Sequence, residues 1–238
     1  MLSGGRPDPD GPLQVAPAPA AWVKRRASAN PRRHGDLGRT LVEEGLRLGR
    51  RGGVAALGLR EITRSVGVSA NAAYRHFAHH DALLVAVAIE ARALLAVHII
   101  DRMGRETTQA DAAARSVQRV SAFGLGYIEF ALREPGWLDL ACYSQHAPHG
   151  AVPVLASSDV PPPPPPHLLL VAALDDMLTS GALTETQRAD AEWVIWSAVE
   201  GFTELTTNGP LQHADRTHLD QLARRVIDTT VQALTHSP

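Results

Sequence analysis

The chain has 238 residues, of which 45% are hydrophobic and only 5% aromatic, and its formal net charge at pH 7 is −2. This length permits one large domain or two modest ones with a sizeable core, and the Ala- and Leu-rich composition with few strand signals predicts an all-α fold. The single cysteine, Cys142, excludes an intrachain disulfide and fits a reducing cytoplasm.

The first residues, 1–33, are rich in Pro, Gly, Ala and Arg and show no apolar period. Such a segment cannot bury enough apolar surface to fold, so we expect a disordered basic tail. It also lacks an uninterrupted apolar stretch of the kind found in signal peptides, so export is not expected. The basic residues between 24 and 33 fit a contact with a polyanion and a solvated tail equally well.

Three helices are predicted at the front of the chain, over 37–51, 59–66 and 70–77. A tight turn joins the last two, because Gly67 can adopt the positive φ that ends one helix and Ser69 can cap the next. On the following helix Asn71 and Arg75 are four residues apart and share a face. Asn pairs with adenine edges and Arg with guanine edges in the major groove, so this pattern predicts a DNA-binding helix-turn-helix. A helical pair without DNA contact is the less favoured alternative.

Charge is divided unevenly along the chain. Residues 1–80 carry 13 Lys and Arg against 6 Asp and Glu, a balance of +7, whereas residues 81–238 carry 10 against 19, a balance of −9. Without the basic residues between 24 and 33 the front would still be +2. A basic front joined to an acidic body is the pattern expected if only the front contacts phosphates.

A long amphipathic helix is predicted from residue 81 to about residue 103. Its apolar stretch, 82–100, is interrupted by Glu90, Arg92 and His98, which argues against a membrane span. We therefore expect this helix to run from the basic front into a helical body.

The rest of the body is predicted to contain helices over 109–133, 136–145, 167–180, 185–207 and 216–235. Six consecutive prolines, 161–166, exclude a helix at the end of the segment 147–166, so we expect an extended Pro-rich loop there. A stiff linker is favoured over a partner-binding polyproline motif.

Catalytic, cofactor and metal patterns are not evident. Gly124-Leu125-Gly126 lacks a preceding strand and the rest of a dinucleotide fingerprint, and the adjacent His79 and His80 point apart on a helix or turn. We therefore expect a protein that is not an enzyme and that has no cofactor or metal site.

Four motifs at the front are RHGDL at 33–37, RRGGVAALGLREI at 50–62, VGVS at 66–69 and AAYRHFAHHDALLVAV at 72–87. Together they resemble the amino-terminal domain of tetracycline-repressor-like (TetR-like) regulators. The resemblance implies that base edges are contacted by Arg60, Asn71 and Arg75, and that phosphates are contacted by Tyr74, His76, His80 and His34 at the start of the first helix. Two positions depart from the family pattern: His80 stands where Lys is frequent, and Gly58 where Ser or Thr commonly caps a helix.

Two further motifs, GYIEFALREPGWLDLACYS at 126–144 and WSAVEGFTEL at 196–205, look like the ligand-binding domain of one branch of the same family. That branch usually has a Trp-His-Gly signature; Trp196 and Gly201 match it, but Glu200 replaces the histidine. The resemblance also implies that the last two long helices pair with those of a second subunit. Candidate dimer contacts are Trp193, Trp196, Leu219, Leu222 and Val226, for which an intramolecular core is the alternative.

The resemblance further implies a small-molecule effector held between helices of the body. The candidates are mostly apolar with a few polar tips, which favours an apolar or aromatic ligand. They are Phe123, Tyr127, Phe130, Trp137, Cys142, Tyr143 and His146. Core packing is the favoured alternative for each, and His146 beside the Pro-rich loop is expected to be solvated instead of metal-bound.

These inferences divide the chain into a tail over 1–33, a helix-turn-helix domain over 34–80 and a helical effector-binding and dimerisation domain over 81–238. The expected function is that of a cytoplasmic bacterial transcriptional regulator, a homodimer on double-stranded DNA without membrane contact. Repression at a palindromic operator, relieved by a small, mostly apolar ligand, is the family's habit. The alternative is a dimeric helical ligand-binding or interaction protein that has lost specific DNA reading.

Overall fold

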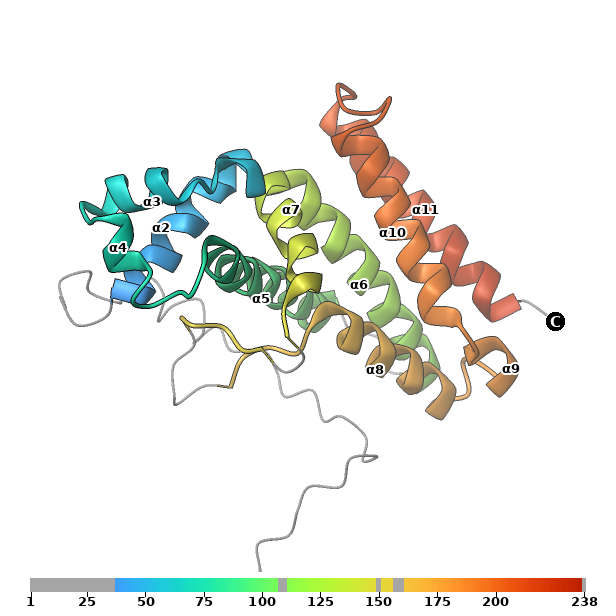
Figure 1. Cartoon of the computed structure of the whole chain (residues 1–238). Coiled ribbons are helices and arrows are strands. Elements are labelled where there is room, and N and C mark those ends of the chain that lie inside the picture. The colour runs from blue at the N-terminus through green and yellow to red at the C-terminus, as the bar shows by residue number, and fades with distance from the viewer. Residues whose placement is uncertain (1–36, 107–110, 149–150, 156–160, 237–238) are drawn as a thin grey trace, which may run out of the picture.

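The computed structural model describes residues 37–106, 111–148, 151–155 and 161–236. The expected tail over 1–33 and the candidate phosphate contact His34 lie outside the described residues. All regular structure within the described residues is helical, which confirms the expected all-α fold. Figure 1 shows a small helical head joined to a larger helical body.

The head consists of α2 (Leu37–Gly52), the 3-10 helix η1 (Val54–Ala56), α3 (Leu59–Val66) and α4 (Ala70–Ala73). The predicted bounds of α3 are confirmed, and those of α2 differ by one residue. Leu41, Ile62 and Ala73 contribute one buried side chain each from α2, α3 and α4 to a shared apolar core. This packing fixes the angle at which α3 and α4 meet.

The turn between α3 and α4 has the geometry that its residues predict. Gly67 has a φ of 78°, in the left-handed region that ends α3. The Ser69 hydroxyl caps α4 by accepting a hydrogen bond from the Ala72 N–H at 3.3 Å. The first turn of α3 has no such cap, because its N-cap residue is Gly58.

The second helix of this pair, α4, is shorter than the predicted range 70–77. Its regular part ends at Ala73, and hydrogen-bonded turns continue the chain, with the Phe77 N–H donating to the Ala73 carbonyl at 3.0 Å. The N–H groups of Arg75 and His76 donate to carbonyls three residues earlier, which tightens this last turn. Residues 74–76 nevertheless remain on the outside of the head.

The body contains α5 (His80–Glu106), α6 (Ala112–Arg133), α7 (Pro135–Tyr143), η2 (Ser144–His146), α8 (Pro166–Thr179), α9 (Glu185–Arg188), α10 (Ala191–Thr207) and α11 (Arg216–His236). Local signals account for several starts. Asp111 caps α6 by accepting from the Ala114 N–H at 2.8 Å. Pro135 and Pro166 occupy first-turn positions of α7 and α8, where a missing N–H costs nothing.

A single helix over 185–207 was predicted wrongly, because the chain breaks between α9 and α10. Asp190 has a φ of 58°, a left-handed conformation that Asp tolerates better than most residues. Thr184 and Gln187 form a capping box at the start of α9, which is a separate short helix. Arg188 bridges the break through ion pairs to Asp175 at 2.8 Å and Glu192 at 2.7 Å.

By length and composition, α5 is apolar enough to cross a membrane, with a mean hydropathy of 2.2 over its most apolar window. However, 78% of that window is buried inside the protein, so α5 is a core helix. It packs against α2 of the head and against α6, α7 and α8 of the body. Its buried Glu90 accepts a hydrogen bond from the Leu155 N–H at 2.5 Å and so holds part of the Pro-rich loop.

The described parts of the predicted loop 147–166 contain no helix up to residue 165, and α8 begins at Pro166. The last two long helices, α10 and α11, lie side by side on the side of the body away from the head (Figure 1). Both pack against α6, which therefore separates them from α5.

Candidate nucleic-acid interface and body cavity

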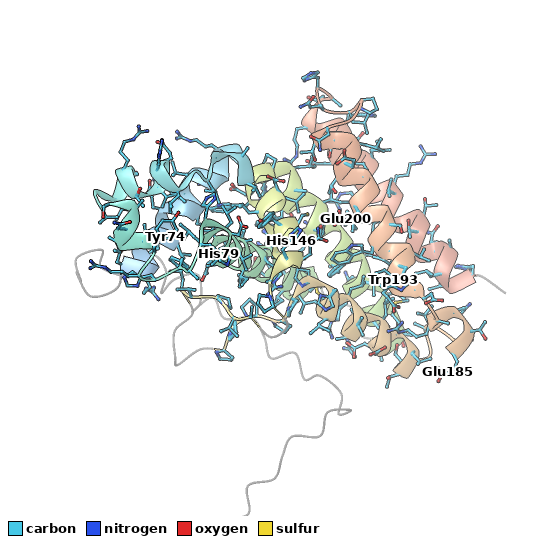
Figure 2. All side chains as sticks on the ribbon, viewed as in Figure 1. Tyr74, His79, His146, Glu185, Trp193 and Glu200 are labelled. Atoms are coloured by element: carbon cyan, nitrogen blue, oxygen red, sulfur yellow. The ribbon has the colours of Figure 1, made fainter. Side chains whose placement is uncertain are left out.

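The outer side of the helix-turn-helix carries four of the residues predicted to contact DNA. Asn71, Tyr74, Arg75 and His76 are all exposed, and Tyr74 is 48% exposed although it is a large aromatic residue. Figure 2 labels Tyr74 on this part of the head. Ala73 of the same turn is buried, so polar and apolar residues separate cleanly between the surface and the head core.

Two guanidinium groups on this surface are available to an anionic partner. Arg60 on α3 and Arg75 after α4 are exposed, and neither forms an ion pair with a described residue. Arg64, also on α3, is paired with Glu61 instead. Arg60 and Arg75 are therefore the arginines of this surface whose donors are free for base edges or phosphates.

Only one of the two ring nitrogens of His80 is available for a phosphate contact. Its ring is half-buried, and Nε2 lies 2.6 Å from the Leu57 carbonyl oxygen, so this nitrogen serves to hold α5 against the head. Only Nδ1 can face an external phosphate. The neighbouring His79 caps α5, because its Nδ1 accepts from the Ala82 N–H at 3.1 Å.

The first half of α7 joins the body to the head. Arg50 of α2 donates two hydrogen bonds to Glu134, at 2.6 and 2.5 Å, and its guanidinium lies 4.9 Å from the centre of the Trp137 ring. The Trp137 indole donates to the Leu46 carbonyl at 2.8 Å. The Val54 N–H donates to Asp139 at 2.8 Å. Helix α7 is thus tied to the head by charged, aromatic and backbone contacts.

The helices at this joint approach closely because glycines face one another. A Cβ atom on Gly136 would lie 2.3 Å from the Gly49 carbonyl oxygen, and one on Gly49 would lie 2.4 Å from Leu140. Gly136 therefore cannot accept a larger residue without moving α7 away from α2, whereas at Gly49 the clash is with the tip of the flexible Leu140 side chain.

The second half of α7 lines a cavity of about 540 Å³ inside the body. Its walls come from α5, α6, α7, η2, α8 and α10. The lining residues are Arg92, Leu95, Tyr127, Ala141, Cys142, Ser144, Gln145, Pro166, His167, Trp196 and Glu200. A second cavity, of about 630 Å³ beneath the Pro-rich loop, shares Arg92, Ser144, Gln145 and His167 with it.

Glu200 and Tyr127 form the polar contact of the inner wall. The Tyr127 hydroxyl donates to the Glu200 carboxylate, and the Trp196 ring meets Tyr127 edge-on at 5.6 Å between centroids. Cys142 is an exposed residue, but desolvation around its thiol, and then the nearby Glu200 carboxylate, raise the thiol pKa to about 11. Glu200 therefore anchors the Tyr127 hydroxyl in this wall.

The opposite polar wall contains Arg92 and His167. Burial lowers the pKa of the Arg92 guanidinium. Burial, and then the positive charge of Arg92, lower the pKa of His167. The Arg92 Nη2 donates to the Ala151 carbonyl at 3.4 Å, a long contact.

Of the seven predicted effector contacts, Tyr127 and Cys142 line the cavity. The other five do not line this cavity, and their contact with a ligand stays a prediction. Phe123 and Phe130 are buried core residues. Trp137 lies at the head joint. Tyr143 and His146 pack on each other with ring centroids 4.7 Å apart. Periodicity cannot separate these positions, since all five lie on helices that have both a cavity side and a packed side.

Sequence reasoning missed Arg92, His167, Trp196 and Glu200 as cavity residues. A usable signal existed for Arg92, because it interrupts an otherwise apolar stretch of α5. Trp196 was assigned to the dimer interface, but its ring packs on Tyr127 and on Phe123, 6.5 Å away. No signal in the sequence separates it from the exposed Trp193, three residues earlier.

The remaining predicted dimer contacts lie on α10 and α11 and differ in exposure. Trp193, labelled in Figure 2, is 63% exposed, whereas Leu222 and Val226 are half-buried against the core. Leu219 is buried within the single chain. Val194 and Leu205 of α10, which were not predicted, are each 45% exposed.

Two protein-family models match the chain. The model described as bacterial regulatory proteins, tetR family, matches residues 41–87, and the model described as tetracyclin repressor-like, C-terminal domain, matches residues 120–230. They cover the helix-turn-helix and most of the body. No curated protein matches the chain.

Two solved structures are similar to the chain. A protein with unknown function from a Rhodococcus species is 26% identical with a TM-score of 0.62, and the match covers 87% of this chain and 100% of that chain. A TetR family transcriptional regulator, PfmR from Thermus thermophilus, is 15% identical with a TM-score of 0.41, covering 81% of this chain and 97% of that chain. The first similarity extends over both head and body.

Proposed function

The chain belongs to the TetR family of bacterial regulatory proteins and is a DNA-binding transcriptional regulator, and from that premise we propose that it is a homodimeric repressor that a small molecule releases from a palindromic operator. One observation carries the proposal: α7 contacts the head through Glu134, Trp137 and Asp139 and lines the body cavity through Ala141 and Cys142. A ligand in the cavity therefore touches the same short helix that holds the head.

In this proposal the exposed side of the helix-turn-helix lies in the major groove. Arg60, Asn71 and Arg75 read base edges, while Tyr74 and His76 hold phosphates, together with His80 through Nδ1 and with His34. Because bacterial operator DNA lies in the cytoplasm, the regulator would act there. Regulation by binding alone requires no catalysis.

Dimerisation through α10 and α11 supplies the two-fold symmetry that a palindrome requires. Trp193, Gly201 and Leu205 recur at intervals of eight and four residues along α10, and all three are exposed. A Cβ atom on Gly201 would meet nothing within 4 Å, so this face is uncovered in the single chain. Exposed apolar residues along one helix face favour burial against a second copy. Two heads then read half-sites about 34–36 Å apart.

Release follows if the ligand-bound body holds the head at a different angle. A ligand that contacts Ala141 and Cys142 favours the α7 position that accommodates it, and α7 carries α2 with it through the Arg50–Glu134 pair. The close packing of Gly136 against Gly49 leaves little slack between the two helices. The population of dimers whose heads match the half-site spacing then falls.

A salt-titrated binding assay tests the proposal, using the full chain and DNA fragments from the region beside its own gene. We expect tight binding to one fragment, a two-fold symmetric footprint and log affinity that falls steeply with log salt concentration. Equally weak binding to every fragment would contradict specific DNA reading. It would favour the alternative, a dimeric ligand-binding protein that no longer reads DNA.

A further inference from the structure

Arg92 places an unneutralised positive charge in the wall of the body cavity. It lies on α5 between the buried Ala91 and Ala93, and is half-buried itself. Among the described residues it forms no ion pair, in contrast to Arg102, which is paired with Glu129 at 2.6 Å, and Arg188. Removing a cation from water without a counter-charge is unfavourable, so the cavity is better suited to an anion than the protein surface around it.

The groups around Arg92 also favour an anion. His167, in the first turn of α8, and Ser144 and Gln145 of η2 line both cavities together with Arg92, so all four gather where the cavities meet. No side chain caps the first turn of α8, because its N-cap residue is Pro165. The positive end of the α8 dipole therefore adds to the charge of Arg92.

The inner wall selects against a second negative charge. Leu95 and Trp196 line the cavity of about 540 Å³ but not the cavity beneath the Pro-rich loop, and they provide an apolar surface. Glu200 lies on the same wall, with its carboxylate held by the Tyr127 hydroxyl. The Glu200 carboxylate would repel a second negative charge that reached this wall, but it would not repel an uncharged hydrocarbon or aromatic group.

We propose that the cavity binds an organic monoanion, a carboxylate with an aliphatic or aromatic body. The carboxylate accepts two hydrogen bonds from the planar fork of Arg92, with His167, Ser144 and Gln145 around it, and the apolar body lies against Leu95 and Trp196. A guanidinium matches a carboxylate in a paired, parallel geometry. The cavity volume of about 540 Å³ falls within the usual range for small-molecule sites, about 300–1,000 Å³. The inference rests on the proposed function in taking this cavity as the effector site.

Calorimetric titration of the full chain without DNA tests the charge preference directly. The probes are two carboxylates, decanoate and 4-phenylbutyrate, each compared with its uncharged primary amide. We expect both carboxylates to bind roughly tenfold to a hundredfold more tightly than their amides, as for a hydrogen bond to a charged group. In Arg92→Gln the carboxylates lose this advantage and the amides bind as before, while Arg92→Lys, which keeps the charge but not the paired fork, retains part of the preference.

The control variant is Arg119→Gln, which removes a half-buried guanidinium that pairs with Asp176 outside the cavity. It should leave all four affinities unchanged. Thermal unfolding of each variant shows whether Arg92 is needed for packing of its aliphatic stem, and Arg92→Lys keeps the test valid if Arg92→Gln unfolds. Failure of both carboxylates to bind at millimolar concentration, equal affinity for acid and amide, or a preference that persists in Arg92→Gln would each overturn the proposal.

A second measurement separates this inference from the proposed function. Carboxylate that binds in an Arg92-dependent way but leaves operator affinity unchanged supports the anion site and contradicts release by this ligand class. Loss of operator binding with decanoate in the wild type, but not in Arg92→Gln, supports both.

Discussion

Arg75 is the residue on which sequence-specific reading depends most directly in the proposed complex. It is exposed after α4 and forms no ion pair with a described residue. We expect Arg75→Ala to weaken binding to the operator by about 1–3 kcal/mol and to relax the preference at one base pair. Competition assays with operators changed at single positions measure both effects.

Arg64→Ala serves as the matched control, because Arg64 is exposed on α3 but pairs with Glu61. It should change operator affinity little. Equal losses for Arg75→Ala on all operator variants would show that Arg75 contacts a phosphate and not a base.

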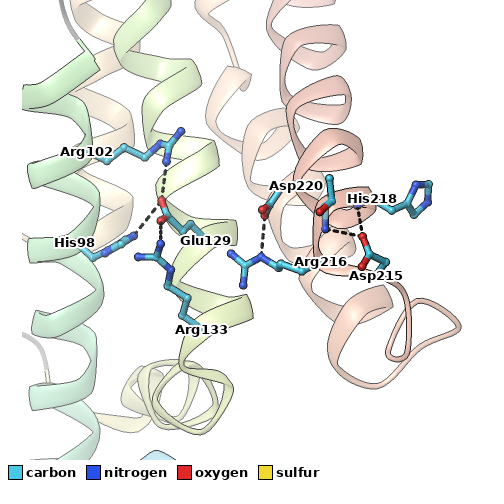
Figure 3. A network of polar contacts seen from close by, with 9 residues as sticks. His98, Arg102, Glu129, Arg133, Asp215, Arg216, His218 and Asp220 are labelled. Atoms are coloured by element: carbon cyan, nitrogen blue, oxygen red, sulfur yellow. Dashed lines mark hydrogen bonds and ion pairs between the residues drawn. The ribbon is translucent and has the colours of Figure 1, made fainter.

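His98 makes the stability of the protein depend on pH. It lies on α5 against α6, 3.6 Å from Glu129, in the cluster that also contains Arg102 and Arg133 (Figure 3). Burial lowers its pKa from 6.5, Glu129 and Asp101 oppose the shift, and the two arginines reinforce it. The unfolded chain therefore binds a proton first as the pH falls below about 6.5, and stability is lost there.

We accordingly expect His98→Gln to lose less stability than the wild type when the pH is lowered from 7.5 to 5.5. Urea unfolding midpoints at the two pH values measure the difference. Glu129 does not enter this window: burial raises the pKa of its carboxyl, but the hydrogen bond from Arg102 and the nearby positive charges outweigh burial and lower the pKa below 4.5. An identical pH dependence in wild type and variant would show that His98 titrates as it does in the unfolded chain.

At the scale of elements, α7 is the helix whose position the proposed mechanism requires. We expect Gly136→Ala to destabilise the protein by about 1–3 kcal/mol, because the new Cβ would overlap carbonyl oxygens of α2. Where the fold survives, displacement of α7 should also alter operator affinity. Thermal unfolding and DNA binding of the same preparation provide the two readouts.

Gly104→Ala is the control, since a Cβ atom on Gly104 would meet nothing within 4 Å. Near the end of α5 this change should stabilise the helix by up to about 1 kcal/mol. If both variants were equally stable, the close approach of α7 to α2 would not be a constraint.

For the whole molecule, the proposed two-fold assembly depends on the outer face of α10. We expect Trp193→Asp to convert a dimer into a monomer, because a charge would replace an apolar side chain that is 63% exposed in the single chain. Sedimentation velocity measures the change, and operator binding should weaken with it, since one head reads only a half-site.

Val152→Asp provides the comparison, because Val152 is also 63% exposed but lies in the Pro-rich loop. The oligomeric state of this variant should match that of the wild type. A Trp193→Asp protein that still sediments as a dimer would place the interface elsewhere.

Local chemistry determined the turn of the helix-turn-helix, and the sequence was sufficient for it, although not for the end of α4. The positive φ of Gly67, the Ser69 cap and the start of α3 depend on neighbours within four residues, so they can be predicted from the chain alone. The family and the all-α class follow from the same kind of local pattern. The break at Asp190 was not predicted, and Arg188 beside it pairs with Asp175 on another helix.

Only the tertiary structure decided which side chains face the cavity. Arg92 and His167 are far apart in sequence and come together because α5 and α8 pack against each other. Trp137 and Trp196 look alike as apolar helix residues, yet one binds the head and the other lines the cavity. Every such helix has several buried sides, and which of them faces a void depends on the packing of all its neighbours, which no local pattern encodes.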